Sequence, residues 1–176
     1  LRFTRLAPKI LLPSWDEAQL SRGSRTYQVK SVNNQSLRIR IKRLSPKDLI
    51  RASLGYRHYT GNGPNSERIK ERIAIPFELI TGKVVADIVV KINADLDTTH
   101  THTLDWKKYL PKKKLEGAFF VSVTGTAAHH PDLSKANNKI AQSLVQLTDI
   151  GLAWKLSNNS TFLYAYSCES GKALPG

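Results

Sequence analysis

The stretch Ser36–Leu44, SLRIRIKRL, alternates apolar with basic residues and decides the fold class. Its alternating apolar residues are Leu37, Ile39 and Ile41. The basic residues between them are Arg38, Arg40 and Lys42. Because successive side chains of a strand point to opposite sides, this period of two predicts a half-buried antiparallel strand with a basic outer face.

Similar strand-like runs, separated by turn residues, occur on both sides of this stretch. Before residue 149 the expected strands are Pro8–Pro13, Arg25–Val32, Ser36–Leu44, Val84–Ile92, Thr98–Leu104, Gly117–Thr126 and Ile140–Thr148. The bracketing prolines place Pro8–Pro13 at a sheet edge. The β-branched residues of Val84–Ile92 predict a central strand. About seven strands predict an all-β fold, an antiparallel β-sandwich of the immunoglobulin or fibronectin type.

One short helix is expected directly after the first stretch. Ser45 can cap its N-terminus, Pro46 suits the first helical position, and Asp48 meets the free amides there. Gly55 is expected to end the helix. The expected apolar stripe of this helix consists of Leu49, Ile50 and Leu54. Residues 56–66 are then expected to form a loop.

The chain is strongly basic, with 27 Lys and Arg against 14 Asp and Glu and a net charge of +13. This charge permits binding to nucleic acid or another polyanion. A solvated surface, balanced elsewhere in a larger protein, is the simpler interpretation, and we favour it. The candidate polyanion contacts are Arg38, Arg40, Lys42, Lys107, Lys108, Lys112, Lys113 and Lys114.

No catalytic motif is found in the sequence: it has no nucleophile elbow, no zinc-protease motif and no phosphate loop. Cys168 is the only cysteine, and we interpret it as a small strand side chain rather than a nucleophile. His100 and His102 share a strand face, and His129 and His130 could add ligands, but nothing indicates that they converge. We therefore expect no enzymatic activity, no cofactor and no metal.

The sequence also lacks membrane and export signals. No run approaches the roughly 20 apolar residues that span a bilayer. The first ten residues, LRFTRLAPKI, have neither the apolar core nor the cleavage site of a signal peptide. The chain also begins without Met, so we expect it to be a segment of a longer protein.

The C-terminal stretch Gln146–Gly176 contains two more strand-like runs, GLAWKL and TFLYAYS, separated by Ser157–Ser160. Two strands do not make a stable domain. We therefore expect residues 1–148 to form one domain and residues 149–176 to be the first two strands of the following one, which is truncated. We expect a shared aromatic face to pack against the first domain or a neighbouring molecule, and full exposure would count against this. Its members are Trp154, Phe162, Tyr164 and Tyr166.

Four segments resemble the bacterial alpha-2-macroglobulin family. Gly117–Val123, GAFFVSV, resembles the strand that closes a macroglobulin-like domain. Gln146–Lys155, QLTDIGLAWK, resembles the junction into the next domain. Phe162–Gly176 resembles that domain's second strand and Gly-Lys turn, and Val32–Leu49 resembles a strand–turn–strand followed by a short helix.

The resemblance implies a structural domain of a large, multidomain inhibitor, periplasmic or bound to the cell envelope as a lipoprotein, that traps endopeptidases of broad specificity. Such proteins use a bait segment and a Cys-Gly-Glu-Gln thioester, and Cys168-Glu169-Ser170 does not match the latter. The implied partners are neighbouring domains and, for the whole protein, proteases; neither specific nucleic acid nor membrane insertion is expected. The alternatives are a basic module that binds nucleic acid or other polyanions, and a cell-surface adhesion domain.

Overall fold

The computed structural model describes residues 4–13, 17–20, 26–59, 74–110, 116–128 and 139–174. Within these ranges the chain forms ten strands, one α-helix and two 3-10 helices. The strands are β1 (Lys9–Leu11), β2 (Glu17–Leu20), β3 (Thr26–Val32), β4 (Asn34–Leu44), β5 (Lys83–Lys91), β6 (Thr99–Asp105), β7 (Gly117–Ala127), β8 (Lys139–Thr148), β9 (Ile150–Leu156) and β10 (Thr161–Ser167). The helices are α1 (Pro46–Tyr59), η2 (Phe77–Leu79) and η3 (Trp106–Lys108).

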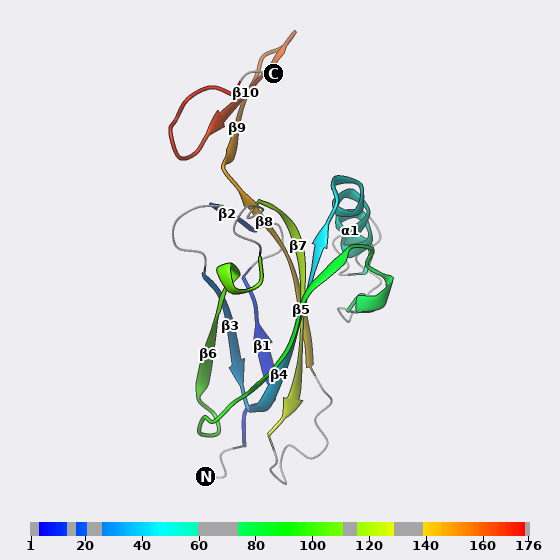
Figure 1. Cartoon of the computed structure of the whole chain (residues 1–176), viewed down its shortest axis with the longest axis vertical. Coiled ribbons are helices and arrows are strands. Elements are labelled where there is room, and N and C mark those ends of the chain that lie inside the picture. The colour runs from blue at the N-terminus through cyan, green and yellow to red at the C-terminus, as the bar shows by residue number, and fades with distance from the viewer. Residues whose placement is uncertain are drawn as a thin grey trace.

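The first eight strands form two facing sheets (Figure 1). One has the order β1-β3-β6 and the other the order β2-β8-β7-β4-β5. The expected all-β sandwich with a helix is therefore confirmed. The pairing is antiparallel except between β2 and β8, which run parallel. The sequence did not predict β2, because EAQL is only four residues long and has no β-branched or aromatic residue.

The core lies between the two sheets. The apolar face of β4 is fully buried there, as its alternation predicted, and so are the aromatic and aliphatic residues of β7 that flank it. Trp106 of η3 closes one end, with its ring centroid 5.7 Å from that of Tyr27 and 5.3 Å from that of Phe119. In this core, the fully buried side chains of β3, β4 and β7 are Tyr27, Val29, Leu37, Ile39, Ile41, Phe119, Val121 and Val123.

Of the two predictions about where a strand lies in its sheet, one is confirmed and one is wrong. β1 lies at a sheet edge, as its prolines predicted. β5 also lies at an edge, so its predicted central position was wrong. Val84 and Val89 of β5 are 50% and 67% exposed. β-branched residues fit any pleated strand, so composition alone does not separate an edge from a centre.

Helix α1 begins as predicted but ends later. The Ser45 hydroxyl accepts a hydrogen bond from the Asp48 amide at 3.2 Å and donates one to the Asp48 carboxylate at 2.6 Å. The helix then passes through Gly55 to Tyr59, so Gly55 does not end it and residues 56–59 are not a loop. A glycine inside a helix costs only about 1 kcal/mol, which neighbouring turns can offset.

The predicted apolar stripe of α1 was wrong in part. Ile50 and Leu54 are each 62% exposed, whereas Ala52 is buried and Leu49 packs against the same cluster. The helix therefore contacts the sheet through a face rotated away from the expected one. In the described ranges, no helix combines the length and hydropathy needed to cross a bilayer.

The last two strands leave the sandwich. β9 and β10 pair with each other but with no strand of the two sheets, and they extend past one end of those sheets (Figure 1). Asp149 alone separates β8 from β9. The described N-terminal residues lie at the opposite end of the molecule (Figure 1).

Candidate functional site

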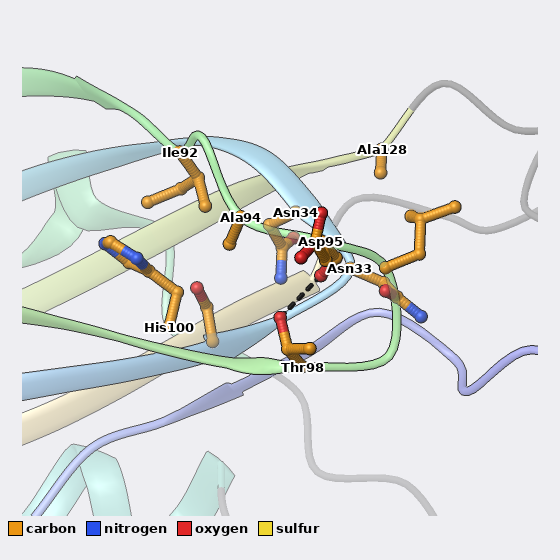
Figure 2. Close-up of a pocket in the computed structure, with 10 residues that line it drawn as sticks. Asn33, Asn34, Ile92, Ala94, Asp95, Thr98, His100 and Ala128 are labelled. Atoms are coloured by element: carbon orange, nitrogen blue, oxygen red, sulfur yellow. Dashed lines mark hydrogen bonds between the residues drawn. The ribbon is translucent and has the colours of Figure 1, made fainter.

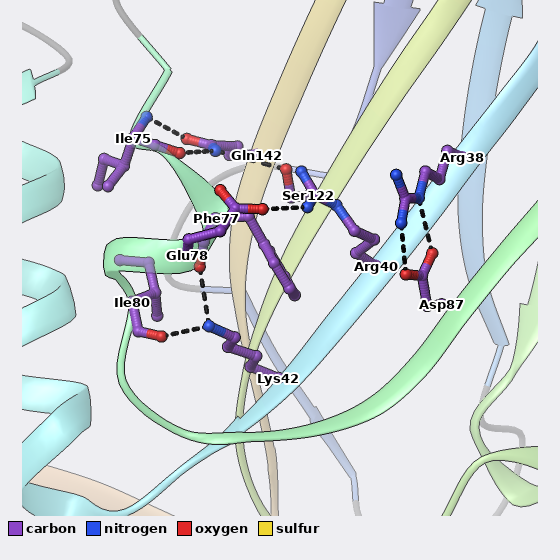
Figure 3. A network of polar contacts seen from close by, with 10 residues as sticks. All are labelled: Arg38, Arg40, Lys42, Ile75, Phe77, Glu78, Ile80, Asp87, Ser122 and Gln142. Atoms are coloured by element: carbon purple, nitrogen blue, oxygen red, sulfur yellow. Dashed lines mark hydrogen bonds and ion pairs between the residues drawn. The ribbon is translucent and has the colours of Figure 1, made fainter.

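The basic row of β4 lies on the outer face of the five-stranded sheet, where two of its members form ion pairs (Figure 3). Arg38 donates twice to Asp87, from Nε at 2.8 Å and from Nη2 at 2.7 Å. Arg40 donates to Glu78 at 2.6 Å. The hydrogen bonds that Arg38 donates to Asp87 lower the pKa of Asp87 and raise the pKa of Arg38. These two arginines are therefore already engaged by carboxylates.

Lys42, the third member of the row, is buried, with only 8% of its surface exposed. Its ammonium donates to the backbone carbonyl of Phe77 at 2.9 Å and to that of Ile80 at 2.5 Å. It also lies 4.5 Å from the centroid of the Phe77 ring. A solvated basic face was expected at this position, and for Lys42 that expectation was wrong, because a segment distant in sequence covers it.

This covering segment, Ile75–Ile80, follows the undescribed residues 60–73 and contains η2. The Gln142 side chain holds its first residue, because Oε1 accepts from the Ile75 amide at 2.9 Å and Nε2 donates to its carbonyl at 2.6 Å. Phe77 packs against Phe120 of β7 at 6.3 Å between ring centroids. The row thus fastens the covering segment and helps build a second core outside the sandwich.

The remaining candidate polyanion contacts do not extend this row. Lys107 and Lys108 are exposed on η3, which follows β6 of the other sheet. Lys112, Lys113 and Lys114 lie outside the described residues. Among the described candidates, the structure therefore brings together only the three of β4, and each of these has a protein partner.

The junction Thr148–Gly151 is held by hydrogen bonds of Thr148 and Asp149. The Thr148 hydroxyl accepts a hydrogen bond from the Ile150 amide at 3.0 Å. The Asp149 carboxylate accepts from the Ser167 hydroxyl at 2.7 Å and from the Glu169 amide at 2.8 Å. The Asp149 carbonyl accepts from the Cys168 amide at 2.7 Å. Asp149 thus ties the start of the hairpin to the turn in which Cys168 lies, a role that sequence reasoning did not assign.

Gly151 leaves room for an aromatic ring. A Cβ at this position would lie 2.5 Å from Cζ of Tyr166, which faces Gly151 in the register of the hairpin. The ring of Tyr166 in turn stacks on that of Tyr164, with centroids 5.7 Å apart and planes at 19°. The Thr-Asp-Ile-Gly sequence therefore combines a local hydrogen bond, an anchoring carboxylate and a site for close packing.

The two faces of the hairpin differ from the expected single aromatic face. Trp154 pairs with Leu163, so these two residues share one face, and Phe162, Tyr164 and Tyr166 occupy the other. The prediction that all four aromatic residues share a face was wrong. Alternation fixes the sides within each strand, but the register between two strands depends on the turn that joins them.

Both faces of the hairpin are apolar and largely uncovered by the rest of the described chain. The exposed fractions are 67% for Trp154, 65% for Phe162 and 50% for Tyr164, whereas Tyr166 is half-buried. On the Trp154 face, Ile150, Leu152, Leu156 and Leu163 are 55–68% exposed. This exposure counts against packing on residues 1–148. Packing against a neighbouring domain stays a prediction.

The histidines do not form a metal site in the described ranges, where no three His, Cys, Asp or Glu side chains gather around a common point. His100 and His102 lie on the half-buried face of β6, and His129 and His130 lie outside the described residues. Burial lowers the pKa of His102, with smaller contributions from the charges of His100 and Lys108. His100 also lines a small hollow beside the β5–β6 turn (Figure 2).

No family model matches the chain, and no curated protein matches it. Three solved structures of Escherichia coli alpha-2-macroglobulin are similar over 96% of the chain. A crystal structure spanning domains NIE-MG1 has a TM-score of 0.55 at 18% identity, with 73% of its length covered. A crystal structure spanning MG0-NIE-MG1 has a TM-score of 0.53 at 18% identity, with 48% covered.

The third structure, a cryo-EM reconstruction of the native conformation of the same protein, has a TM-score of 0.56 at 17% identity. The chain spans only 10% of that structure's length. At such identities the likeness establishes a shared fold. The resemblance to the bacterial alpha-2-macroglobulin family, which the sequence indicated, is thereby confirmed at the level of the fold. The chain has the fold of the NIE-MG1 segment of E. coli alpha-2-macroglobulin.

Proposed function

We propose that the chain is a structural segment of a bacterial alpha-2-macroglobulin-like inhibitor that traps endopeptidases in the periplasm or at the cell envelope. The shared fold over 96% of the chain supports this proposal. In it, residues 1–148 are one domain, and residues 149–176 are the first two strands of the next. The chain itself has no catalytic role.

One observation carries the proposal: the β9–β10 hairpin leaves the sandwich with apolar residues exposed on both faces. An isolated two-stranded hairpin is at best marginally stable in water. Large exposed apolar surfaces usually mark interaction sites. The remaining strands of a following sandwich, in the same parent chain, are the partner that would cover these faces.

In this proposal residues 1–148 act by position. The single-residue link at Asp149, held by Ser167 and Glu169, limits how the following domain can be oriented against the sandwich. Proteases are then targets of the whole inhibitor, whose bait segment and thioester would lie elsewhere in its chain. Neighbouring domains are the direct partners of this segment.

Protease assays test the proposal. A serine endopeptidase and a metalloendopeptidase, each acting on a protein substrate, are incubated with the 176-residue chain or with the protein encoded by its complete reading frame. The whole protein should lower both rates at stoichiometric amounts, whereas the chain alone should leave both unchanged. Inhibition by the chain alone, or none by the whole protein, would contradict the proposal.

A further inference from the structure

A small hollow lies where three connections of the sandwich meet (Figure 2). Ser31 lines it from the end of β3, Asn33 and Asn34 from the turn and the start of β4, Asp95 and Thr98 from the β5–β6 turn, and Ala128 from just after β7. Its volume is about 10 Å³. On this measure, which counts the space open to the centre of a water molecule, about 10–15 Å³ is the least that holds one water, so the hollow has room for at most one and is far too small for an organic ligand.

Two buried polar atoms of the lining residues have no hydrogen-bond partner among the described residues: Ser31 Oγ and Asn34 Oδ1. Ser31 is 1% exposed and Asn34 is 4% exposed. The Asn34 amide nitrogen already donates to the carbonyls of Lys9 and Val32, at 3.0 and 2.8 Å, which fixes the orientation of its side chain. Unpaired buried polar groups are costly and rare in native proteins.

We propose that this hollow is a hydration site in which one ordered water donates to Asn34 Oδ1 and exchanges a hydrogen bond with Ser31 Oγ. The water supplies two donors and two acceptors, which match one carbonyl-type acceptor and one hydroxyl. A cation fits the site less well. Among its lining residues only Asp95 carries a carboxylate, its side chain is exposed, and Ca²⁺ takes six to eight oxygen ligands.

The hydration site joins contacts that already hold this end of the sandwich. The Ala128 amide donates to the Asn33 carbonyl at 2.9 Å, and the Ile92 amide donates to the Gln35 carbonyl at 2.9 Å. Asn33 also donates to Leu6 and to Asp97, at 2.6 and 2.8 Å. The water therefore adds to a network that holds the incoming N-terminal segment against the two turns.

A crystal structure of the full chain at a resolution of about 1.5 Å, sufficient to place ordered waters, tests the site directly. The expected result is one water with hydrogen-bond distances to Ser31 Oγ and Asn34 Oδ1. A dry hollow would overturn the proposal. A metal ion there, recognised by short coordination distances and anomalous scattering, would overturn it as well.

Urea unfolding of Ser31→Ala gives an independent test. If the hydroxyl is bonded to a bound water, its loss should raise the unfolding equilibrium constant about five-fold, the effect of one lost hydrogen bond. If the hydroxyl is unpaired, removing it should leave the protein equally or more stable, which would contradict the proposal. Ser53→Ala, at a partly exposed position of α1, is the control and should have little effect.

Discussion

The ammonium of Lys42 lies 4.5 Å from the centre of the Phe77 ring and 2.9 Å from the carbonyl oxygen of the same residue. A single lysine thus contacts both the ring and the backbone of η2. Lys42 therefore holds the covering segment against β4. That segment contributes Phe77 and Ile80 to the second core, outside the sandwich.

Replacing Lys42 with Met should destabilise the fold by about 2 kcal/mol. The variant keeps the apolar stem but leaves the carbonyls of Phe77 and Ile80 without their charged donor, and hydrogen bonds to charged groups contribute about 1.5–3 kcal/mol. Urea unfolding measures the change. Lys30→Met, at an exposed position of β3, is the matched control and should shift stability by less than about 0.5 kcal/mol.

Asp97 should make stability depend on pH under acidic conditions. Hydrogen bonds from Arg5, Asn33 and the Leu6 amide lower its pKa from 3.8 to about 2. Because the folded state lowers the pKa, ionised Asp97 favours folding. This contribution is complete above about pH 4 and is lost as the pH falls through about 2.

The Asp97→Asn variant tests this dependence. Its urea midpoint should fall less steeply between pH 4 and 2 than that of the wild-type chain, although it starts lower at pH 7. Asn93→Ala, an exposed residue of the same connection that does not titrate, is the control and should keep the wild-type slope. Equal slopes for Asp97→Asn and the wild type would count against a role for Asp97.

Asp149→Ala should loosen the hairpin without unfolding the sandwich. The variant removes the acceptors of Ser167 and of the Glu169 amide, so amide hydrogen exchange in β9 and β10 should accelerate about ten-fold or more. Exchange in β4 and β7 should not change. Asn158→Ala, in the exposed turn of the hairpin, is the control, and acceleration of equal size there would refute an anchoring role for Asp149.

Trp154 reports whether the hairpin has a partner. In the 176-residue chain its side chain is 67% exposed, so its fluorescence should be readily quenched by acrylamide, unlike that of buried Trp106. In the protein encoded by the complete reading frame, the strands of the proposed following domain should protect it. Comparison with Trp154→Phe isolates its signal. Unchanged quenching in that protein would argue against the proposed domain organisation.

Binding to polyanions should be weak and should not depend on the row of β4. Arg38 is paired with Asp87, so the charge-neutral double variant Arg38→Gln/Asp87→Asn should elute from heparin at nearly the wild-type salt concentration. A matched double variant of the exposed lysines, Lys107→Gln/Lys108→Gln, should elute earlier. Retention of either protein beyond physiological salt would favour a dedicated polyanion site.

The sequence predicted most strands because a period of two needs only local information. SLRIRIKRL forms a strand with Leu37, Ile39 and Ile41 inside, as expected. The environment of Lys42 was not predictable in this way, because it depends on a segment more than 30 residues later in the chain. The helix was predicted to end at Gly55 but continues to Tyr59, since glycine permits a helix to stop but does not force it.

For the β9–β10 hairpin, the sequence predicted which aromatic residues it contains but not how they are arranged. Trp154, Phe162, Tyr164 and Tyr166 belong to two paired strands, as the runs GLAWKL and TFLYAYS indicated, although the exposure of the first three was not expected. Their division between two faces follows from the pairing of Leu156 with Thr161 across the turn, which no single strand encodes. Asp149 was named only as a boundary, although its carboxylate anchors the hairpin.

The junction at Asp149 also determines how the molecule would bear mechanical load. β8 passes into β9 through one residue, and the two described ends of the chain lie at opposite ends of the molecule (Figure 1). Tension applied at the hairpin would therefore run along β8, whose hydrogen bonds to β2 and β7 lie across the direction of pull. Those hydrogen bonds would be loaded in shear and would have to break together rather than one after another. The sandwich should therefore resist extension along β8.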